Sequence, residues 1–129
     1  MIKAVIIDDE KDARFLLRNL VEKKFHSRIE VVGEADDVAP GVELIKSCNP
    51  DLVFLDIQMK KGTGFDLLKE FDKINFEVIF ITAYNQHAIE AFKFSAVDYL
   101  LKPIKLNELN DAVNKFDDLL NMKKGGDKR

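Results

Sequence analysis

The chain has little cysteine and no long apolar run. Its one cysteine, Cys48, has no partner within the chain, which excludes an intramolecular disulfide, and the apolar Leu44 and Ile45 nearby favour a small buried residue over a redox role. A free thiol without disulfides fits a reducing compartment, so we expect a cytoplasmic protein. No apolar run approaches the roughly 18 residues of a membrane span. Asp8 and Asp9 interrupt the first run, so we expect neither a signal peptide nor membrane contact.

An excess of positive charge is also missing. The chain carries 20 Lys and Arg against 23 Asp and Glu, a net charge of −3, so no basic field would attract a nucleic acid. We therefore expect no direct nucleic-acid contact by this domain, although a partner domain could supply one. The hydrophobic share of 47% and the charged share of 33% are typical of a soluble globular protein, and 129 residues suffice for one domain with a substantial core.

Short apolar runs alternate with longer segments of helical spacing. Four runs are almost continuously apolar, as the strands of a parallel sheet are when helices cover both of its faces. Another run, at 29–35, places Glu30 and Glu34 between apolar residues, which is typical of an edge strand. The expected strands cover 4–7, 29–35, 52–55, 78–81 and 97–101. The expected helices cover 13–25, 38–45, 65–71, 86–94 and 106–120.

Five successive strand–helix units predict an α/β fold. Right-handed crossovers between parallel strands leave few strand orders, of which the flavodoxin-like order 2-1-3-4-5 is the natural one. The prediction is therefore a doubly wound five-stranded parallel sheet with helices on both faces. Asp37 is suited to cap the second helix, and Gly62 and Gly64 mark the loop before the third.

Polar side chains follow the apolar runs at the points where the strands end. They are Asp8 and Asp9 after the first run, then Asp56, Thr82 and Lys102. Because the carboxyl ends of parallel strands meet at one edge of a sheet, these five side chains should gather there. In the order 2-1-3 the connections of strands 1 and 3 leave in opposite directions, and the crevice between them is the expected ligand site.

Three clustered carboxylates indicate a cation site at this edge. Asp8, Asp9 and Asp56 would repel one another and hold protons more tightly unless a cation relieves them. Oxygen ligands without neighbouring Cys or His favour Mg²⁺ or Mn²⁺. Lys102 supplies a positive charge and Thr82 a hydroxyl donor, which suit the added negative charge of a phosphoryl group. We therefore predict a site that accepts a phosphoryl group and registers its arrival.

Through four short motifs the chain resembles the receiver domains of two-component response regulators over residues 1–121. Residues 122–129 are expected to form a flexible linker or tail. The run that leads to Tyr99 and Lys102 is most similar to receivers of regulators with LytTR-type DNA-binding domains. The motifs, each at the end of a predicted strand, are Ile7-Asp8-Asp9-Glu10, Leu55-Asp56-Ile57-Gln58-Met59, Ile81-Thr82-Ala83 and Leu101-Lys102-Pro103.

The resemblance implies a role for each matching residue at the site. Asp56 would be the nucleophile that becomes phosphorylated. Mg²⁺ would be held by Asp8, Asp9 and Asp56 and by the backbone carbonyl of Gln58. Lys102 would pair with the phosphoryl oxygens.

The resemblance also implies a switch. Thr82 would move to bond a phosphoryl oxygen, and Tyr99 occupies the position of the switch aromatic. The bond between Lys102 and Pro103 is expected to be cis. Phosphorylation would change the face formed by the fourth helix, the fifth strand and the last helix, and would promote a homodimer through it.

Partners outside the chain follow from the same resemblance. A sensor histidine kinase would donate the phosphoryl group, and the output would be transcription through a DNA-binding domain that is not part of this chain. The domain would catalyse only its own phosphorylation and dephosphorylation, so it is not expected to be an enzyme. Two residues depart from the family pattern: Ser95 replaces a common glycine, and Lys60 replaces a proline and should loosen the loop after Asp56.

Three alternative functions fit the same fold. A flavin-binding electron carrier would need a phosphate loop rich in Ser, Thr and Gly after the first strand, where this chain is acidic. A Mg²⁺-dependent phosphatase would use Asp56 on external substrates, but no insertion supplies a lid over the substrate. A pseudo-receiver would bind partners without phosphorylation, and the intact Asp56, Thr82 and Lys102 argue against it.

The remaining aromatic residues are expected to have structural places. His26 and His87 stand alone in the sequence, so we expect them at the surface and without a metal. The ten phenylalanines are spread through the predicted helices and strands and are expected in the core.

Overall fold

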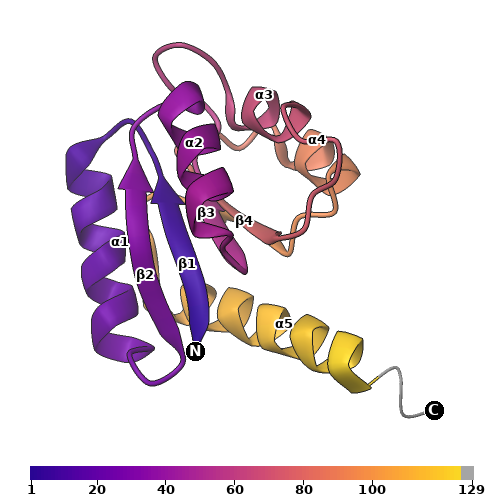
Figure 1. Cartoon of the computed structure of the whole chain (residues 1–129). Helices are drawn as coiled ribbons and strands as arrows, with labels where there is room; N and C mark the ends of the chain where they lie inside the picture. The colour runs from indigo at the N-terminus through magenta and orange to yellow at the C-terminus, as the bar shows by residue number, and fades with distance from the viewer. Residues whose placement is uncertain (126–129) are drawn as a thin grey trace.

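Five parallel strands form the centre of the protein (Figure 1). The computed structural model describes residues 1–125, with side chains described as far as Lys123. The strand order is β2-β1-β3-β4-β5, so the predicted doubly wound order is confirmed and β2 lies at an edge. Every neighbouring pair is parallel. The strands are β1 (Ile2–Ile7), β2 (Ile29–Ala35), β3 (Leu52–Leu55), β4 (Glu77–Thr82) and β5 (Asp98–Leu101).

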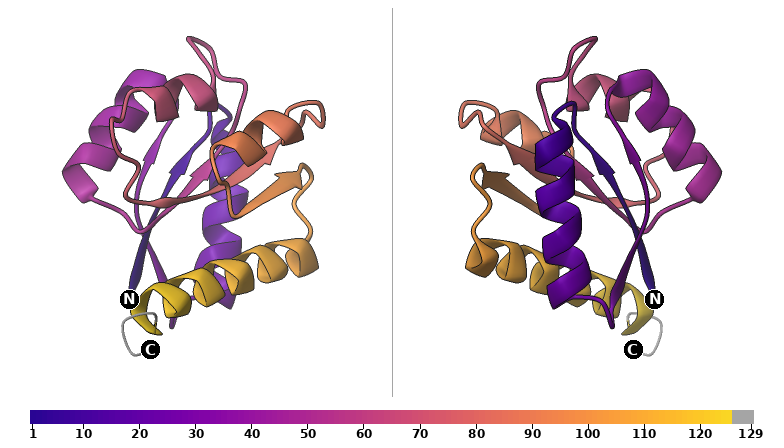
Figure 2. Two further views of the ribbon diagram at one scale, coloured as in Figure 1. Left: turned by 90° about the vertical axis from the view of Figure 1, so that its right-hand side faces the viewer. Right: turned by 90° about the vertical axis from the view of Figure 1, so that its left-hand side faces the viewer.

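Helices cover both faces of this sheet (Figure 2). Ala4 and Ile6 of β1 belong to the core cluster on the side of α1 and α5, whereas Val5 and Ile7 belong to the cluster under α2, α3 and α4. This alternation is the period of two that a strand imposes on its side chains. The helices are α1 (Lys11–Lys24), α2 (Val38–Cys48), α3 (Gly64–Lys69), α4 (Ala88–Lys93) and α5 (Leu106–Gly125).

Side-chain caps set the ends of two helices. Asp37 precedes α2 and accepts a hydrogen bond from the N–H of Val38, as its position in the sequence predicted. Asn49 ends that helix in the left-handed conformation, with φ of 49°, which asparagine tolerates better than most residues. Thr63 and Asp66 form a capping box at the start of α3. Asp37 and Thr63 thus fix the starts of the two helices that leave the carboxyl edge of the sheet after β2 and β3.

The last helix is longer than the sequence pattern indicated. We expected it to end near residue 120, whereas α5 continues to Gly125. Residues 122–125 of the predicted linker are therefore helical, and residues 126–129 lie outside the described residues. Within residues 1–125, no helix combines the length and the apolarity that a membrane crossing requires.

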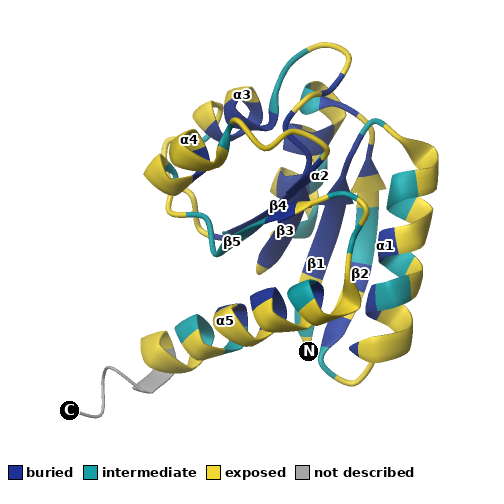
Figure 3. Cartoon of the chain, turned by 180° about the vertical axis from the view of Figure 1, so that it is seen from behind, coloured by how far each residue is buried: buried dark blue, intermediate teal, exposed yellow. Residues whose placement is uncertain are grey.

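Burial follows the layers of the fold, with a few informative exceptions (Figure 3). The central strands are buried, and the outer faces of the helices are exposed. The expectation that all phenylalanines lie in the core is wrong for Phe15 of α1 and Phe92 of α4, whose exposed fractions are 56% and 86%. Ile89, also in α4, is 80% exposed. An apolar surface therefore covers the outer side of this short helix.

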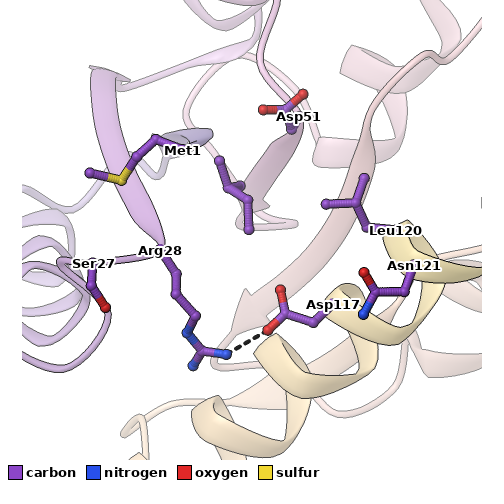
Figure 4. Close-up of a pocket in the computed structure, with 8 residues that line it drawn as sticks. Met1, Ser27, Arg28, Asp51, Asp117, Leu120 and Asn121 are labelled. Carbon is purple, nitrogen blue, oxygen red and sulfur yellow. Dashed lines mark hydrogen bonds and ion pairs between the residues drawn. The ribbon is translucent and has the colours of Figure 1, made fainter. Parts of the chain in front are cut away.

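A hollow of about 590 Å³ lies at the amino edge of the sheet (Figure 4). The predicted site lies at the other edge, where the strands end. Met1, Asp51 and Arg28 immediately precede or begin the strands there, and Asp117 and Asn121 of α5 form the other wall. Arg28 Nη1 donates to Asp117 Oδ2 at 2.5 Å across the hollow.

Candidate functional site

The loops that follow β1, β3 and β5 meet at the carboxyl edge of the sheet. Lys102 Nζ lies 2.9 Å from Asp8 Oδ2 and 3.1 Å from Asp56 Oδ2. It also lies 2.7 Å from Glu10 Oε1. An ammonium has three N–H donors, so each of these carboxylates can take one. The structure thus brings three of the predicted site residues together and adds Glu10 to them.

Two of these three carboxylates are buried. The exposed fraction is 5% for Asp8 and 4% for Asp56. A buried charge is stable only when it is paired and hydrogen-bonded, and both carboxylates meet this condition. Asp56 Oδ1 accepts the N–H of Ile57 at 2.7 Å, and Asp8 Oδ1 accepts the N–H of Glu10 at 2.9 Å. Each carboxylate therefore uses one oxygen for a backbone N–H and the other for Lys102.

The position of Asp56 depends on a close approach of α3. A Cβ atom at Gly64 would lie 2.5 Å from the carbonyl oxygen of Asp56, which is backbone and cannot move aside. Gly64 can therefore donate its N–H to the carbonyl of Ile57 at 2.8 Å. On the other side, the N–H of Asp56 donates to the carbonyl of Ile7 at 2.9 Å, which ties the end of β3 to β1. The glycine predicted as a loop marker thus has a packing role.

Burial and close charges shift the pKa values at the site. Burial raises the pKa of Asp8 from 3.8 to about 6. The negative charge of Asp56 also raises this pKa, whereas the hydrogen bonds from Lys102 and from the N–H of Glu10 lower it. Burial alone would lower the pKa of Lys102, but its hydrogen bonds to Glu10 and Asp8 and the charge of Asp56 raise it above the ordinary value. The hydrogen bond from Lys102 lowers the pKa of Glu10. Lys102 is therefore positively charged at neutral pH.

The carboxylates form a cluster that could hold a metal ion. One oxygen from each of Asp8, Asp9, Glu10 and Asp56 can be chosen so that all four lie within 4.8 Å of one another. The donors are all oxygens, the type that Mg²⁺ and Ca²⁺ prefer. Burial makes Asp8 reluctant to ionise, and a nearby cation would oppose that effect. The residues present therefore fit a hard divalent cation, and Asp9 is the half-exposed member of the cluster.

Thr82 and Tyr99 are linked through the backbone of Tyr84. Thr82 is completely buried at the end of β4, and its Oγ1 accepts the N–H of Tyr84 at 3.4 Å. The hydroxyl of Tyr99 donates to the carbonyl oxygen of Tyr84. The carbonyl of Thr82 also accepts the N–H of Lys102 at 2.8 Å, and the peptide bond between Lys102 and Pro103 is cis. The end of β4 is thus joined both to Lys102 and to Tyr99.

Gln58 connects the loop after β3 to the start of α4. Its side chain is exposed, and its Nε2 lies 3.4 Å from His87 Nε2. The imidazole also packs edge-on against Phe65, with ring centroids 6.1 Å apart, and against Tyr84 at 6.4 Å. His87 is therefore half-buried among side chains near the site, and the expectation that it stands alone at the surface is wrong.

Comparison with known proteins identifies the family. The sequence family described as the response regulator receiver domain matches residues 4–114. The chain belongs to this family. Receiver domains act in two-component signalling, so the resemblance noted in the four motifs is confirmed.

Full-length relatives of this receiver domain are about twice as long. An uncharacterized response regulatory protein of Vibrio parahaemolyticus is 42% identical over 121 residues, which are 93% of this chain and 49% of that protein. The sensory transduction protein LytT of Bacillus cereus is 36% identical over 118 residues, 90% of this chain and 47% of that protein. The chain therefore spans about half the length of the curated relatives that it matches.

A solved receiver domain has the same fold. The receiver domain of AraT, a response regulator from Geobacillus stearothermophilus, has a TM-score of 0.85 and 31% identity to this chain. The match covers 95% of this chain and 98% of that one.

An anchor holds the receiver's loop after Asp56, where Lys60 led us to expect loosening. The backbone N–H of Lys61 donates to both carboxylate oxygens of the buried Asp37, with 3.2 Å from the nitrogen to each oxygen. The N–H of Met59 also donates to the carbonyl of Gly62 at 3.0 Å within the loop. The contact between Asp37 and Lys61 joins loops that are 24 residues apart in the sequence. No sequence pattern pointed to it, because Asp37 was explained completely as a helix cap.

Proposed function

We propose that Asp56 accepts a phosphoryl group from the phosphohistidine of a sensor kinase, with Mg²⁺ bound beside it. The observation that carries this proposal is the charged Lys102, which lies 3.1 Å from a carboxylate that is 4% exposed and directly follows β3. The ion would be held by carboxylates of Asp8, Asp9 and Asp56 and by the carbonyl of Gln58. When bound, Mg²⁺ would neutralise charge on the phosphoryl oxygens.

The residues of this chain are suited to the transfer step. The Asp56 carboxylate would form an O–P bond while the P–N bond of the donor breaks and its electron pair returns to the imidazole nitrogen. The hydrogen bond from Ile57 to Asp56 Oδ1 holds the carboxylate in one orientation. Lys102 would transfer a hydrogen bond to the phosphoryl oxygens, where a charge-assisted bond is strongest. The domain would thus catalyse only its own phosphorylation and dephosphorylation.

Phosphorylation would be transmitted through Thr82. If its hydroxyl turns toward a phosphoryl oxygen, it gives up the hydrogen bond with Tyr84, whose carbonyl accepts from Tyr99. The loop after β4 and the tyrosine of β5 would then rearrange together. A few charge-assisted hydrogen bonds supply about 1–3 kcal/mol of coupling, which is enough to shift a balanced equilibrium. We therefore expect the active conformation to be partly populated without the phosphoryl group.

The output surface would be the face of α4, β5 and α5, paired with a second copy of the chain. Ile89 and Phe92 expose an apolar surface there beside Lys93. On the same face Lys115 donates to Asp98 at 2.9 Å, so both signs of charge are present for a symmetric contact. Transcription would then be controlled by a DNA-binding domain outside this chain, in line with the greater length of its relatives.

The test of the proposed chemistry is the mass of the intact protein after incubation with acetyl phosphate and Mg²⁺. We expect one added phosphoryl group, about 80 Da. Asp56→Asn should abolish the modified species, and excess EDTA should prevent it. Labelling that proceeds equally well in EDTA would contradict the role of the metal. An unmodified wild-type protein would favour the pseudo-receiver.

The dimer has its own test, sedimentation with and without beryllofluoride and Mg²⁺. We expect a dimer that depends on concentration and forms mainly with beryllofluoride. Phe92→Ser should weaken it, whereas Phe15→Ser, which changes an exposed phenylalanine of α1, should not. Tyr99→Ala should reduce the response to beryllofluoride. A mass that is the same in all conditions would mean that the output surface lies elsewhere.

A further inference from the structure

Glu10 occupies the position of a helix cap but does not act as one. It is the residue before α1, and its side chain makes no capping hydrogen bond. Ser, Thr, Asp and Asn are preferred at this position because their short side chains reach the free N–H groups of the first turn. Glu10 instead extends to Lys102, with 2.7 Å between Oε1 and Nζ. Its side chain therefore contributes to the site and not to the helix.

The contact with Glu10 occupies a donor that the phosphoryl group needs. Lys102 donates hydrogen bonds to Glu10 and Asp56, and its ammonium forms a further ion pair with Asp8 at 2.9 Å, so three carboxylates surround its three N–H donors. A phosphoryl oxygen that approaches the ammonium of Lys102 would therefore displace one of these carboxylates. The three differ in what withdrawal costs, because a carboxylate that leaves its partner must be hydrated or left unpaired.

Exposure decides which carboxylate withdraws. The side chain of Glu10 is 63% exposed, whereas those of Asp8 and Asp56 are 8% and 5% exposed. Glu10 can turn into solvent and be hydrated there, while Asp8 would remain buried without its cation. We propose that Glu10 is a positioning residue that competes with the incoming phosphoryl group for Lys102 and thereby slows phosphorylation. This inference rests on the proposed phosphorylation of Asp56.

Lys102 does not need Glu10 to keep its place. Two buried carboxylates hold its ammonium, and its backbone N–H donates to the carbonyl of Thr82 at 2.8 Å. Removal of the Glu10 carboxylate should therefore free one donor of Lys102 and leave the ammonium in position. The effect should appear in the rate of phosphorylation. It should not appear in hydrolysis of the phosphorylated form, in which Glu10 has already been displaced.

Three variants separate this competition from a general effect of charge. Glu10→Gln removes the carboxylate. Glu10→Asp keeps the negative charge but shortens the side chain, and aspartate at this position is drawn to the N–H groups of α1. Asp12→Asn is the control, because Asp12 is an exposed acid of the first turn and no hydrogen bond or ion pair of its side chain is found within residues 1–123.

The experiment measures the initial rate of Asp56 phosphorylation by acetyl phosphate at saturating Mg²⁺, by intact mass. We expect Glu10→Gln and Glu10→Asp to be about twofold to fivefold faster than wild type, as for the loss of one exposed ion pair. Asp12→Asn should match wild type. After removal of the phosphodonor, the lifetime of the phosphorylated form should be the same in all four proteins.

Several results would overturn the proposal. A rate for Glu10→Gln equal to that of wild type would mean that Glu10 does not compete. Acceleration in Glu10→Gln but not in Glu10→Asp would mean that Glu10 acts by repulsion of the phosphodonor alone. Slower labelling that is restored by more Mg²⁺ would make Glu10 a metal ligand. Absence of labelling in wild type would instead refute the proposed function itself, on which this inference depends.

Discussion

The two edges of the sheet both hold a cation beside carboxylates, but they differ in burial. At the amino edge Arg28 pairs with Asp117, and their side chains are 40% and 24% exposed. At the carboxyl edge Lys102 pairs with Asp8 and Asp56, whose side chains are 8% and 5% exposed. The hollow at the amino edge measures about 590 Å³, whereas the one beside Asp8 and Lys102 measures about 90 Å³.

The proposed site therefore lies at the edge where charge is buried, and not at the edge with the larger hollow. A half-exposed ion pair keeps much of its hydration, so it contributes little stability. At the carboxyl edge the carboxylates of Asp8 and Asp56 are largely removed from water, and burial raises the pKa of Asp8 to about 6. A fold that maintains such an arrangement forgoes stability at this edge, as functional sites often do.

The largest expected difference between the edges concerns phosphorylation. Lys102→Ala removes the only described cation within 3.1 Å of Asp56, so we expect phosphorylation by acetyl phosphate to slow by about 100-fold or more. Arg28→Ala removes a cation from the opposite edge and should leave the rate unchanged. Initial rates from intact mass would compare the two variants. A similar loss in both would show that the edges are not functionally distinct.

The next difference is in the dependence of stability on pH. Asp8 binds its proton more tightly in the folded protein, at a pKa of about 6 against 3.8, so ionisation of Asp8 lowers the free energy of unfolding as the pH rises from about 4 to about 6. Above that range Asp8→Asn should therefore be more stable than wild type by about 1–3 kcal/mol without Mg²⁺.

Urea unfolding at several pH values in the presence of EDTA measures this effect. The control is Asp117→Asn, whose carboxylate belongs to the exposed pair at the amino edge. The gain in stability of Asp8→Asn should vanish only well below pH 4, where the carboxyl of Asp8 is protonated in both the folded and the unfolded protein. A variant that is less stable than wild type at pH 7 would contradict the assigned effect of burial.

The smallest expected effect is the coupling between Arg28 and Asp117. A partly exposed ion pair contributes about 0.2–1 kcal/mol, although Arg28 also lies over the ring of Phe25, with 5.2 Å from Cζ to the ring centroid. A double-mutant cycle with Arg28→Ala and Asp117→Ala would measure the pair by itself. A coupling energy of several kcal/mol would mean that this edge is as desolvated as the other.

Much of the fold followed from the sequence because the central strands β1, β3 and β4 are buried on both faces. Continuous apolar runs identify such strands directly, because both faces point into the core, and the polar residue after each run marked the end of the strand. The bounds of α3 and α4 were less certain, since six-residue helices show too little periodicity. The last helix was underestimated because residues 121–125 have polar and glycine residues that mimic a linker.

The part of the site formed by residues that directly follow the strands could be predicted from the sequence. Asp8, Asp56 and Lys102 met as expected because parallel strands end at one edge. Glu10 was not singled out, because its long side chain reaches a lysine 92 positions away in the sequence. The packing of His87 against Gln58 was missed for the same reason. Contacts made by long side chains across loops leave no local pattern.

The most direct test of the account is the map of backbone amide chemical shifts on addition of Mg²⁺ and beryllofluoride. We predict that the largest changes lie at residues that follow the strands, with Asp9, Ile57, Thr82 and Lys102 foremost, and that the changes extend through Tyr84 to Tyr99. Amides that line the amino-edge hollow, such as Ser27 and Arg28, should stay in place. Changes centred on that hollow, or none at the carboxyl edge, would contradict it.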